Sequence, residues 1–313
     1  MNTALRFLLI LYCAAIVSGC QSTDPLNNTS ASAKVLVVNS NSALPRYSVP
    51  EQAFIKQMKE VELLQVDLAN DEHPTETLQD TLNAHNVDAI YCIGAKALGS
   101  IDYLSPPAPV VYSSVLSWRE FQNRAHFFGV TDGVAPAAQL AWFKHFFPTI
   151  KSIGILYSET SISVIEDAKQ SAQALSLNLM TQELSPGIER EKQISAFIQS
   201  VDALWILPDP VVLDSEANTL QLFELAHRLQ VPVFAYNPFF MDLGATLSIN
   251  ADLATTGRQA ALMVQTLSQS RVPPNQVQFP AGSNVSLNLR NVKQYNMTLD
   301  GDALNSVSEL LDK

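Results

Sequence analysis

The sequence predicts an α/β protein of two lobes, each a parallel sheet flanked by helices, with hinge crossovers between them. Short apolar runs alternate with amphipathic stretches, an order typical of parallel strands that are joined by helices. The alternation occurs twice, before and after a joining segment near Phe127 to Gly133. Segments after Tyr236 do not simply extend the second sheet, which predicts several chain crossings and therefore a cleft and a hinge.

The first lobe begins with Lys34 to Asn39, whose apolar run predicts a buried strand. Pro50 to Val61 has its apolar residues at helical spacing and predicts a helix. The other elements expected here are a helix over 75–85 and strands over 63–68, 88–93 and 109–115.

The second lobe repeats this pattern. The predicted helices cover 135–147, 163–175, 188–201 and 215–229, and the predicted strands cover 152–157, 177–184, 203–207 and 232–236. A strand over 244–249, a helix over 251–267 that Pro273 and Pro274 terminate, and an extended run over 277–289 follow. We therefore assign 34–131 plus 246–273 to the N-terminal lobe and 132–245 plus 274–313 to the C-terminal lobe.

Composition limits the possible partners. The chain has 313 residues, of which 47% are hydrophobic and 16% charged, so it has ample core material for two lobes. Its formal net charge is -11, and its 19 Lys and Arg form no cluster along the sequence. Nucleic acid and an anionic membrane surface are therefore not expected partners, because binding through counterion release needs clustered cations.

The N-terminus predicts a lipoprotein signal peptide over residues 1–19. Arg6 precedes an apolar run over 7–17, which is too short to cross a hydrocarbon core of about 30 Å as a helix and is typical of an export signal. The run ends in Val-Ser-Gly-Cys at 17–20, which resembles the bacterial lipobox. We expect Cys20 to carry the lipid that holds the chain on the membrane, since several acyl chains anchor a protein stably. The alternative is an ordinary secretory signal with a chance cysteine.

Residues 20–33 comprise this cysteine and a polar, flexible tether. By resemblance to bacterial sorting rules, Gln21 favours the outer membrane, so we expect a lipid-anchored protein on the periplasmic face of the cell envelope. The mature chain keeps Cys20 and Cys92, which excludes a disulfide framework. Cys92 is expected to be a small buried hydrophobe.

Several segments match a known family in order and spacing. Residues 93–97 (IGAKA) look like its strand-turn-helix, 128–132 (FGVTD) like its first crossover, and 146–157 (FFPTIKSIGILY) like its helix end and following strand. Further matches lie at 202–210, 231–235, 244–248, 256–259 and 286–292. From about Lys34 to Leu299 the chain thus resembles the ABC transporter substrate-binding protein family with the type I periplasmic-binding fold, whose better-understood members bind aromatic amino acids. The resemblance implies a small-molecule ligand and, as partner, an ABC permease or a membrane sensor.

The sequence departs from this family at three places. The family's Asp-Pro-Val turn is replaced by 113–118 (SSVLSW), and its Gly-Gly-Asn loop by 124–127 (RAHF). Small and acidic residues of the family are replaced by the bulky 236–240 (YNPFF). These changes indicate that the chemistry of the cleft has changed, and a fold alone does not carry function across such changes.

Ligands of open α/β sheets bind beyond the carboxyl ends of the strands. The candidate ligand-binding residues at these ends are Ser40, Asn41, Ser42, Gly94, Ala95, Ser113, Ser114, Tyr157, Ser158, Ser161, Asp209, Tyr236 and Asn237. Hydroxyls, amides and helix N-termini suit a small zwitterion. Asp209 is expected to pair with an ammonium group, and Tyr236 or Trp118 to cover an apolar part.

Each candidate also has a structural interpretation. The serines and Asn41 are residues that cap helices or close turns. Asp209 is followed by Pro210 and is placed to open a helix. The bulky segment from Tyr236 to Phe240 suits a lobe interface or a patch for a partner protein as well as a ligand platform.

Catalytic motifs are not found in the sequence. The five histidines have no ligand spacing, and there is neither a nucleophile turn nor a phosphate loop, so we expect no enzyme activity, metal or cofactor. The sequence instead predicts a monomeric, lipid-anchored periplasmic protein that binds a small organic ligand, such as an amino acid, for ABC uptake or signalling. The alternative is an outer-membrane interaction or regulatory module whose cleft has degenerated.

Overall fold

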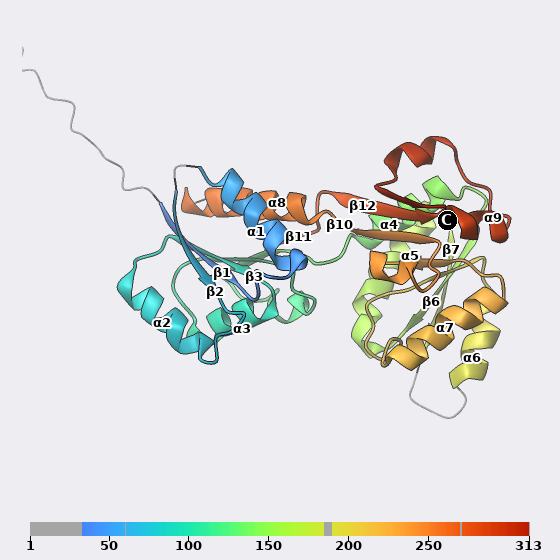
Figure 1. The fold of residues 1–313 in the computed structure, drawn as a ribbon, viewed down its shortest axis with the longest axis horizontal. Coiled ribbons are helices and arrows are strands. Elements are labelled where there is room, and N and C mark those ends of the chain that lie inside the picture. Colours follow the sequence, from blue (N-terminus) through green and yellow to red (C-terminus); the bar gives the residue numbers. More distant parts are fainter. Residues whose placement is uncertain (1–32, 60, 185–189, 270, 313) are drawn as a thin grey trace, which may run out of the picture. The chain divides into compact units, whose positions relative to one another are not determined.

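The computed structural model describes residues 33–59, 61–184, 190–269 and 271–312. The predicted signal peptide, Cys20 and all of the tether except Ala33 lie outside these residues. The described chain forms two sheets, each with helices on both faces, and we call these units the first and second lobe (Figure 1). None of its helices combines the length and apolarity that crossing a membrane requires.

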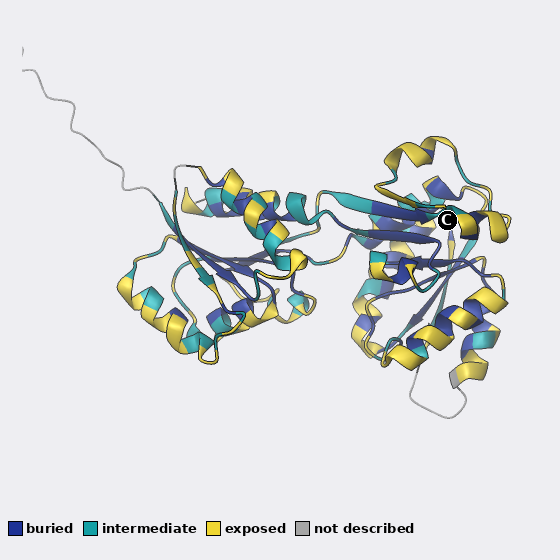
Figure 2. Cartoon of the chain, in the orientation of Figure 1, coloured by how far each residue is buried: buried dark blue, intermediate teal, exposed yellow. Residues whose placement is uncertain are grey.

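The first lobe has six strands, all parallel, in the order β11-β5-β4-β3-β1-β2. These are β1 (Lys34–Asn39), β2 (Glu62–Asp67), β3 (Ala89–Ile93), β4 (Val110–Ser113), β5 (Phe127–Val130) and β11 (Val277–Gln278). Its helices are α1 (Pro45–Gln57), α2 (Pro74–Ala84), α3 (Ala95–Leu104), α8 (Leu253–Ser268) and the 3-10 turn η1 (Trp118–Glu120). Strands β1 and β3 are buried on both faces, as the continuous apolar runs predict, because helices cover both sides of a parallel sheet (Figure 2).

The second lobe has seven strands in the order β13-β12-β10-β9-β8-β6-β7, of which only the β10–β12 pair is antiparallel. These are β6 (Ser152–Tyr157), β7 (Asn178–Glu183), β8 (Ala203–Trp205), β9 (Val233–Ala235), β10 (Leu247–Ala251), β12 (Ser283–Asn288) and β13 (Glu309–Leu311). The helices are α4 (Pro136–Phe146), α5 (Ile162–Ala174), α6 (Arg190–Ile198), α7 (Glu216–Arg228) and α9 (Leu289–Gln294), with 3-10 turns η2 (Glu159–Ser161), η3 (Pro238–Met241) and η4 (Asp302–Ser306).

The lobe boundaries assigned from the sequence need correction. Strand β10 pairs with β9 and β12 in the second sheet, so the returning segment reaches the first lobe only at α8 and not at residue 246. The expected single run over 277–289 is two strands: β11 pairs with β5 in the first sheet, and β12 lies in the second. The chain therefore crosses between the lobes three times, after β5, after β10 and after β11.

Two first-lobe elements also differ from their predicted extents. Helix α1 begins at Pro45, five residues earlier than expected, because proline is well suited to the first helical turn. Phe127 to Val130 was expected to join the lobes but is itself strand β5, and only the residues after it form the crossover.

Helices α1 and α8 approach each other closely at Gly257. A Cβ atom at this position would lie 2.1 Å from the carbonyl oxygen of Pro50, which is inside α1. Glycine is needed here because a Cβ would clash with a backbone atom, which cannot rotate away as a side-chain atom can. The contact fixes α8, which returns from the second sheet, on the face of the first.

Gly257→Ala is expected to destabilise the protein although alanine is the better helix former. Helix propensity favours alanine by about 1 kcal/mol, whereas overpacking against a fixed neighbour costs about 1–3 kcal/mol. The matched control is Gly99→Ala in α3, where nothing lies within 4 Å of the new Cβ. Urea unfolding should show a loss of stability for the first variant and a gain for the second; equal gains would contradict the close contact.

Candidate functional site

The turn after β1 is held by hydrogen bonds within the protein. The hydroxyl of Ser40 accepts a hydrogen bond from the backbone N–H of Ala97 in α3 at 3.0 Å. The side chain of Asn41 accepts one from the N–H of Ala43 at 3.1 Å, and the Ser42 hydroxyl is bonded to Asp67. Burial raises the pKa of Asp67, but the hydrogen bonds from Ser42 and Ala69 outweigh this effect and lower it. These predicted ligand residues therefore shape the turn.

The ends of β3 and β4 are also built from internal contacts. Gly94 has a positive φ of 89°, and a Cβ there would lie 2.6 Å from the Ser40 hydroxyl. The hydroxyl of Ser113 is buried and lies 2.7 Å from the hydroxyl of Tyr91. Ser114 has a φ of 57° and donates to the carbonyl of Arg46 at 3.1 Å. Ala95, which is also predicted to bind ligand here, is exposed and is the first residue of α3.

Asp209 organises the equivalent edge of the second lobe. Its carboxylate accepts hydrogen bonds from the backbone N–H and the hydroxyl of Ser158, at 2.7 and 2.9 Å, and from the side chain of Ser161. The N–H groups of Val211 and Val212 donate to it at 2.9 and 3.1 Å. Burial raises the pKa of Asp209, and these donors lower it below its usual value. Only 1% of the residue is exposed.

The expected role of Asp209 as partner of an ammonium group is therefore not supported. Its oxygens accept from donors in two segments, and these bonds fix the turn after β6 against the segment after β8. Ser158 and Ser161 are partners in the same network. Asp209 therefore has a structural role, but it begins a turn and not the helix expected from the sequence, because α7 starts only at Glu216.

Aromatic side chains remain at the second edge. Tyr157 ends β6 and is half-buried, and Tyr236 follows β9 with its ring packed edge-on against Phe240 at 5.3 Å. Asn237 is exposed, but its side chain caps η3 by accepting from the N–H of Phe239 at 2.9 Å. Tyr157 and Tyr236 are thus the two predicted ligand residues of the second lobe whose rings lie at the carboxyl edge of its sheet.

Arg46 and Asp132 form an ion pair that sequence reasoning missed. Arg46 is the second residue of α1, Asp132 follows β5 in the first crossover, and the guanidinium lies 3.5 Å from the carboxylate. Burial raises the pKa of Asp132 and Arg46 opposes this. Burial, together with the negative charge of Asp132, also raises the pKa of Tyr236. The pair therefore lies at the carboxyl edge of the first sheet within electrostatic reach of the second lobe.

The two aspartates differ in what they can still bind. Within the described residues the Asp132 carboxylate has one recorded partner, Arg46, whereas that of Asp209 is surrounded by donors. A half-buried carboxylate with a single long contact retains free lone pairs. Nearby, the Arg119 guanidinium lies over the ring of Trp118, 4.3 Å from the ring centre. Burial lowers the pKa of Arg119, and the negative charge of Asp167 in α5 opposes this. Charged and aromatic groups thus gather at this edge.

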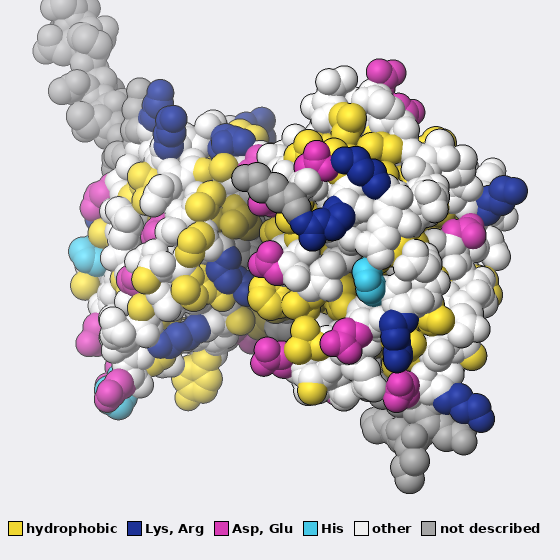
Figure 3. Space-filling view, turned by 45° about the vertical axis from the view of Figure 1, so that its right-hand side comes forward, with side chains coloured by type: hydrophobic (Ala, Val, Ile, Leu, Met, Phe, Trp, Pro, Cys, Tyr) yellow, Lys and Arg dark blue, Asp and Glu magenta, His cyan; other side chains and the backbone are white. Residues whose placement is uncertain are grey.

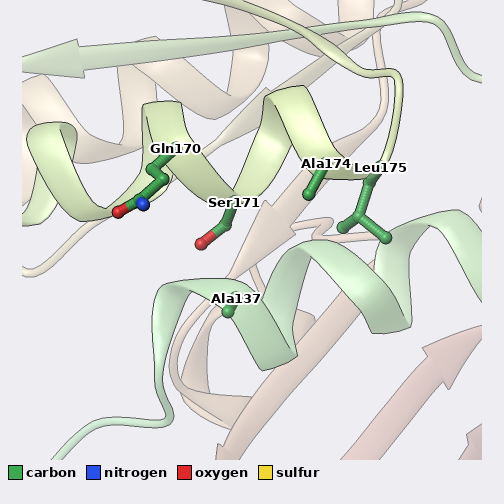
Figure 4. A pocket seen from close by; sticks show the side chains of 5 residues that line it. All are labelled: Ala137, Gln170, Ser171, Ala174 and Leu175. Carbon is green, nitrogen blue, oxygen red and sulfur yellow. The ribbon is translucent and has the colours of Figure 1, made fainter.

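The hollows recorded on the surface lie elsewhere, on helices α4 and α5. One is lined by Ala137 of α4 and, from α5 and its end, by Gln170, Ser171, Ala174 and Leu175 (Figure 4). A second one lies along α4 beside Trp142. Both are open surface grooves whose linings contain no Lys, Arg, Asp or Glu, so the polar chemistry of the strand ends is the better candidate for ligand recognition.

Asp209→Ala is expected to lower the free energy of unfolding at pH 7 by about 3 kcal/mol, because it leaves several buried donors without an acceptor. The folded pKa of Asp209 is lowered, so its stabilisation is present above the usual value of 3.8 and is lost as the pH falls through the folded pKa. Urea unfolding should therefore show a deficit that shrinks below about pH 4. The exposed Asp80→Ala is the control; a deficit independent of pH would contradict this assignment.

Comparison with known proteins places this arrangement in a family. A family model described as ABC transporter substrate binding protein matches residues 52–310. A comparison with curated proteins gives no match.

Solved structures share the fold. A ligand-free, open structure of a substrate-binding protein with adhesive properties from Clostridium difficile is 16% identical, with a TM-score of 0.70 over 90% of this chain and 100% of that chain. An ABC domain from Streptococcus pneumoniae in complex with L-Trp is 17% identical, with a TM-score of 0.58 over 90% and 100%. A conserved domain protein from Vibrio cholerae is 19% identical, with a TM-score of 0.56 over 89% and 99%. The chain belongs to the ABC transporter substrate-binding protein family.

Proposed function

We propose that this protein binds a small zwitterionic ligand, such as an amino acid, between its lobes, with Arg46 and Asp132 as the charged contacts. The observation that carries the proposal is the Arg46–Asp132 pair, whose 3.5 Å separation and incomplete hydrogen bonding leave both groups able to exchange partners. The family supports ligand binding, and the solved Streptococcus pneumoniae relative holds L-Trp.

Each member of the pair suits one end of a zwitterion. The guanidinium of Arg46 offers a planar fork of donors that matches a carboxylate. The carboxylate of Asp132 would accept from the ligand's ammonium group. When a zwitterion binds, Arg46 and Asp132 each exchange one partner for another, so neither half-buried charge is left alone. A simple acid would leave Asp132 without a partner, and a simple amine would leave Arg46 without one, which is costly.

The rest of the ligand would contact aromatic rings. Trp118 of the first lobe and Tyr157 and Tyr236 of the second are half-buried at the strand ends. Such rings provide apolar area at a small loss of conformational entropy. We propose binding rather than catalysis, and among the described residues no three His, Cys, Asp or Glu side chains gather in a way that suits a metal ion.

The location of the protein belongs to the same proposal. The lipobox-like segment ending at Cys20 supports a lipid anchor on the periplasmic side of the envelope, and Gln21 supports the outer membrane. The ligand would serve ABC uptake or a membrane sensor. The tether of residues 20–32 reaches less than about 50 Å at roughly 3.5 Å per residue, so an anchored molecule stays near its own membrane.

A regulatory interaction module is the second candidate. Phe239 of η3 is 64% exposed, and it belongs to the bulky 236–240 segment that replaces small and acidic residues of the family. An exposed ring of this size favours contact with a partner protein. Under this alternative, no small ligand stabilises the chain.

Thermal unfolding of residues 21–313 with amino acids and small metabolites tests the ligand. One zwitterion should raise Tm by several degrees, and Arg46→Ala or Asp132→Asn should weaken its binding at least about tenfold, because each removes a charge-assisted hydrogen bond. The control is Arg228→Ala, which removes an exposed arginine that lies 4.0 Å from the Glu191 carboxylate. A flat panel from a cooperatively unfolding protein would favour the interaction module.

Cell fractionation tests the anchor separately. Cys20→Ser should move the protein from the membrane to the soluble periplasmic fraction, because no acyl chain can then be attached. Gln21→Asp should shift the lipidated protein toward the inner membrane. Membrane association that survives Cys20→Ser would refute the lipid anchor.

A further inference from the structure

Three exposed cationic residues lie at the ends of two neighbouring helices of the first lobe. Lys56 lies in the last turn of α1, Lys59 follows it, and Arg271 follows α8. The helices run side by side and in the same direction (Figure 1). Figure 3 shows Lys and Arg side chains over this part of the lobe. This arrangement was not visible in the sequence because more than two hundred residues separate Arg271 from the two lysines.

These cations are not neutralised within the described residues. None of the three forms an ion pair there, whereas Lys34 pairs with Glu62 at 3.0 Å. Val272, next to Arg271, is 73% exposed and is among the most exposed large apolar side chains. Unpaired cations beside an exposed apolar residue are typical of a surface that meets lipid headgroups.

The described chain also enters the fold at this end. It begins at Ala33, directly before β1, and the starts of parallel strands lie at the edge where the connecting helices end. Thirteen residues separate this point from Cys20, counting Cys20 itself. A lipid there would hold this edge nearest to the bilayer. Glu62 and Asp88, at the starts of β2 and β3, also lie at this edge, where Glu62 pairs with Lys34 and Asp88 accepts from the backbone N–H of Lys34. Although the protein has a net charge of -11, Lys56, Lys59 and Arg271 remain at this end to attract anionic headgroups.

We propose that the end of the first lobe formed by Lys56, Lys59, Arg271 and Val272 lies against the anionic headgroups of the membrane that holds Cys20. The opposite edge of the sheet, with Arg46 and Asp132, then points away from the bilayer. This inference rests on the proposed lipid anchor, and it differs from the expectation from composition that an anionic membrane surface is no partner.

Lysine footprinting tests the contact. The chain from Cys20 is coupled through that thiol to a maleimide lipid, while Cys92 is buried and protected. Acetylation of each lysine is followed by mass spectrometry on vesicles with and without phosphatidylglycerol. Lys56 and Lys59 should react at least about fivefold more slowly on the anionic vesicles, an effect lost at about 1 M salt, where screening acts within about 3 Å. The exposed Lys169 of α5 should not change.

Three outcomes would overturn the proposal. Equal rates for Lys56 and Lys59 on both kinds of vesicle would show no contact. Protection that Arg271→Glu leaves unchanged would exclude an electrostatic cause. Protection in native envelopes but not on protein-free vesicles would mean that a protein covers these lysines. Because coupling replaces the natural lipid, the footprint and the Cys20→Ser fractionation can fail independently.

Discussion

All six strands of the first sheet run in one direction, and the positions of the candidate charged pair and of the cationic helix ends depend on this constraint. The turns that follow β1, β3, β4 and β5 leave the sheet at a single edge. Arg46 and Asp132, which are 86 residues apart in sequence, meet there because both follow strands of this sheet. The same constraint sends the starts of the strands and the ends of α1 and α8 to the opposite edge. One edge therefore serves recognition and the other is free for attachment.

The two aspartates have different roles: Asp209 stabilises the fold of the second lobe, and Asp132 is the candidate ligand contact. Asp209 uses its charge to hold backbone N–H groups of the second lobe, and this explains why its pKa falls although it is buried. In the described part of the chain the Asp132 carboxylate has one partner, and its pKa rises because burial is not compensated by comparable hydrogen bonding. A carboxylate that lacks donors is the one that gains most from a ligand. This physical difference, more than position at a strand end, identifies the candidate binding group.

The sequence was sufficient for the fold class because β1 and β3 are continuous apolar runs and most helices have their apolar residues at helical spacing. It was not sufficient for β11, which has two residues and is defined by its partner β5. Strand-end position selected Ser40, Ser113 and Asp209, whose polar groups are bound internally. It did not select Arg46, which lies inside a helix whose start was placed too late. Whether a polar group is already satisfied depends on contacts distant in sequence, which no local pattern contains.

The most direct test of the central claim is a crystal structure of residues 21–313 with the zwitterion that most stabilises them. The account predicts a ligand carboxylate within hydrogen-bonding distance of the Arg46 guanidinium and a ligand ammonium group on Asp132, with the bonds of Asp209 to Ser158 unchanged. A ligand bound through Asp209, or one that leaves the Arg46–Asp132 pair intact, would contradict it.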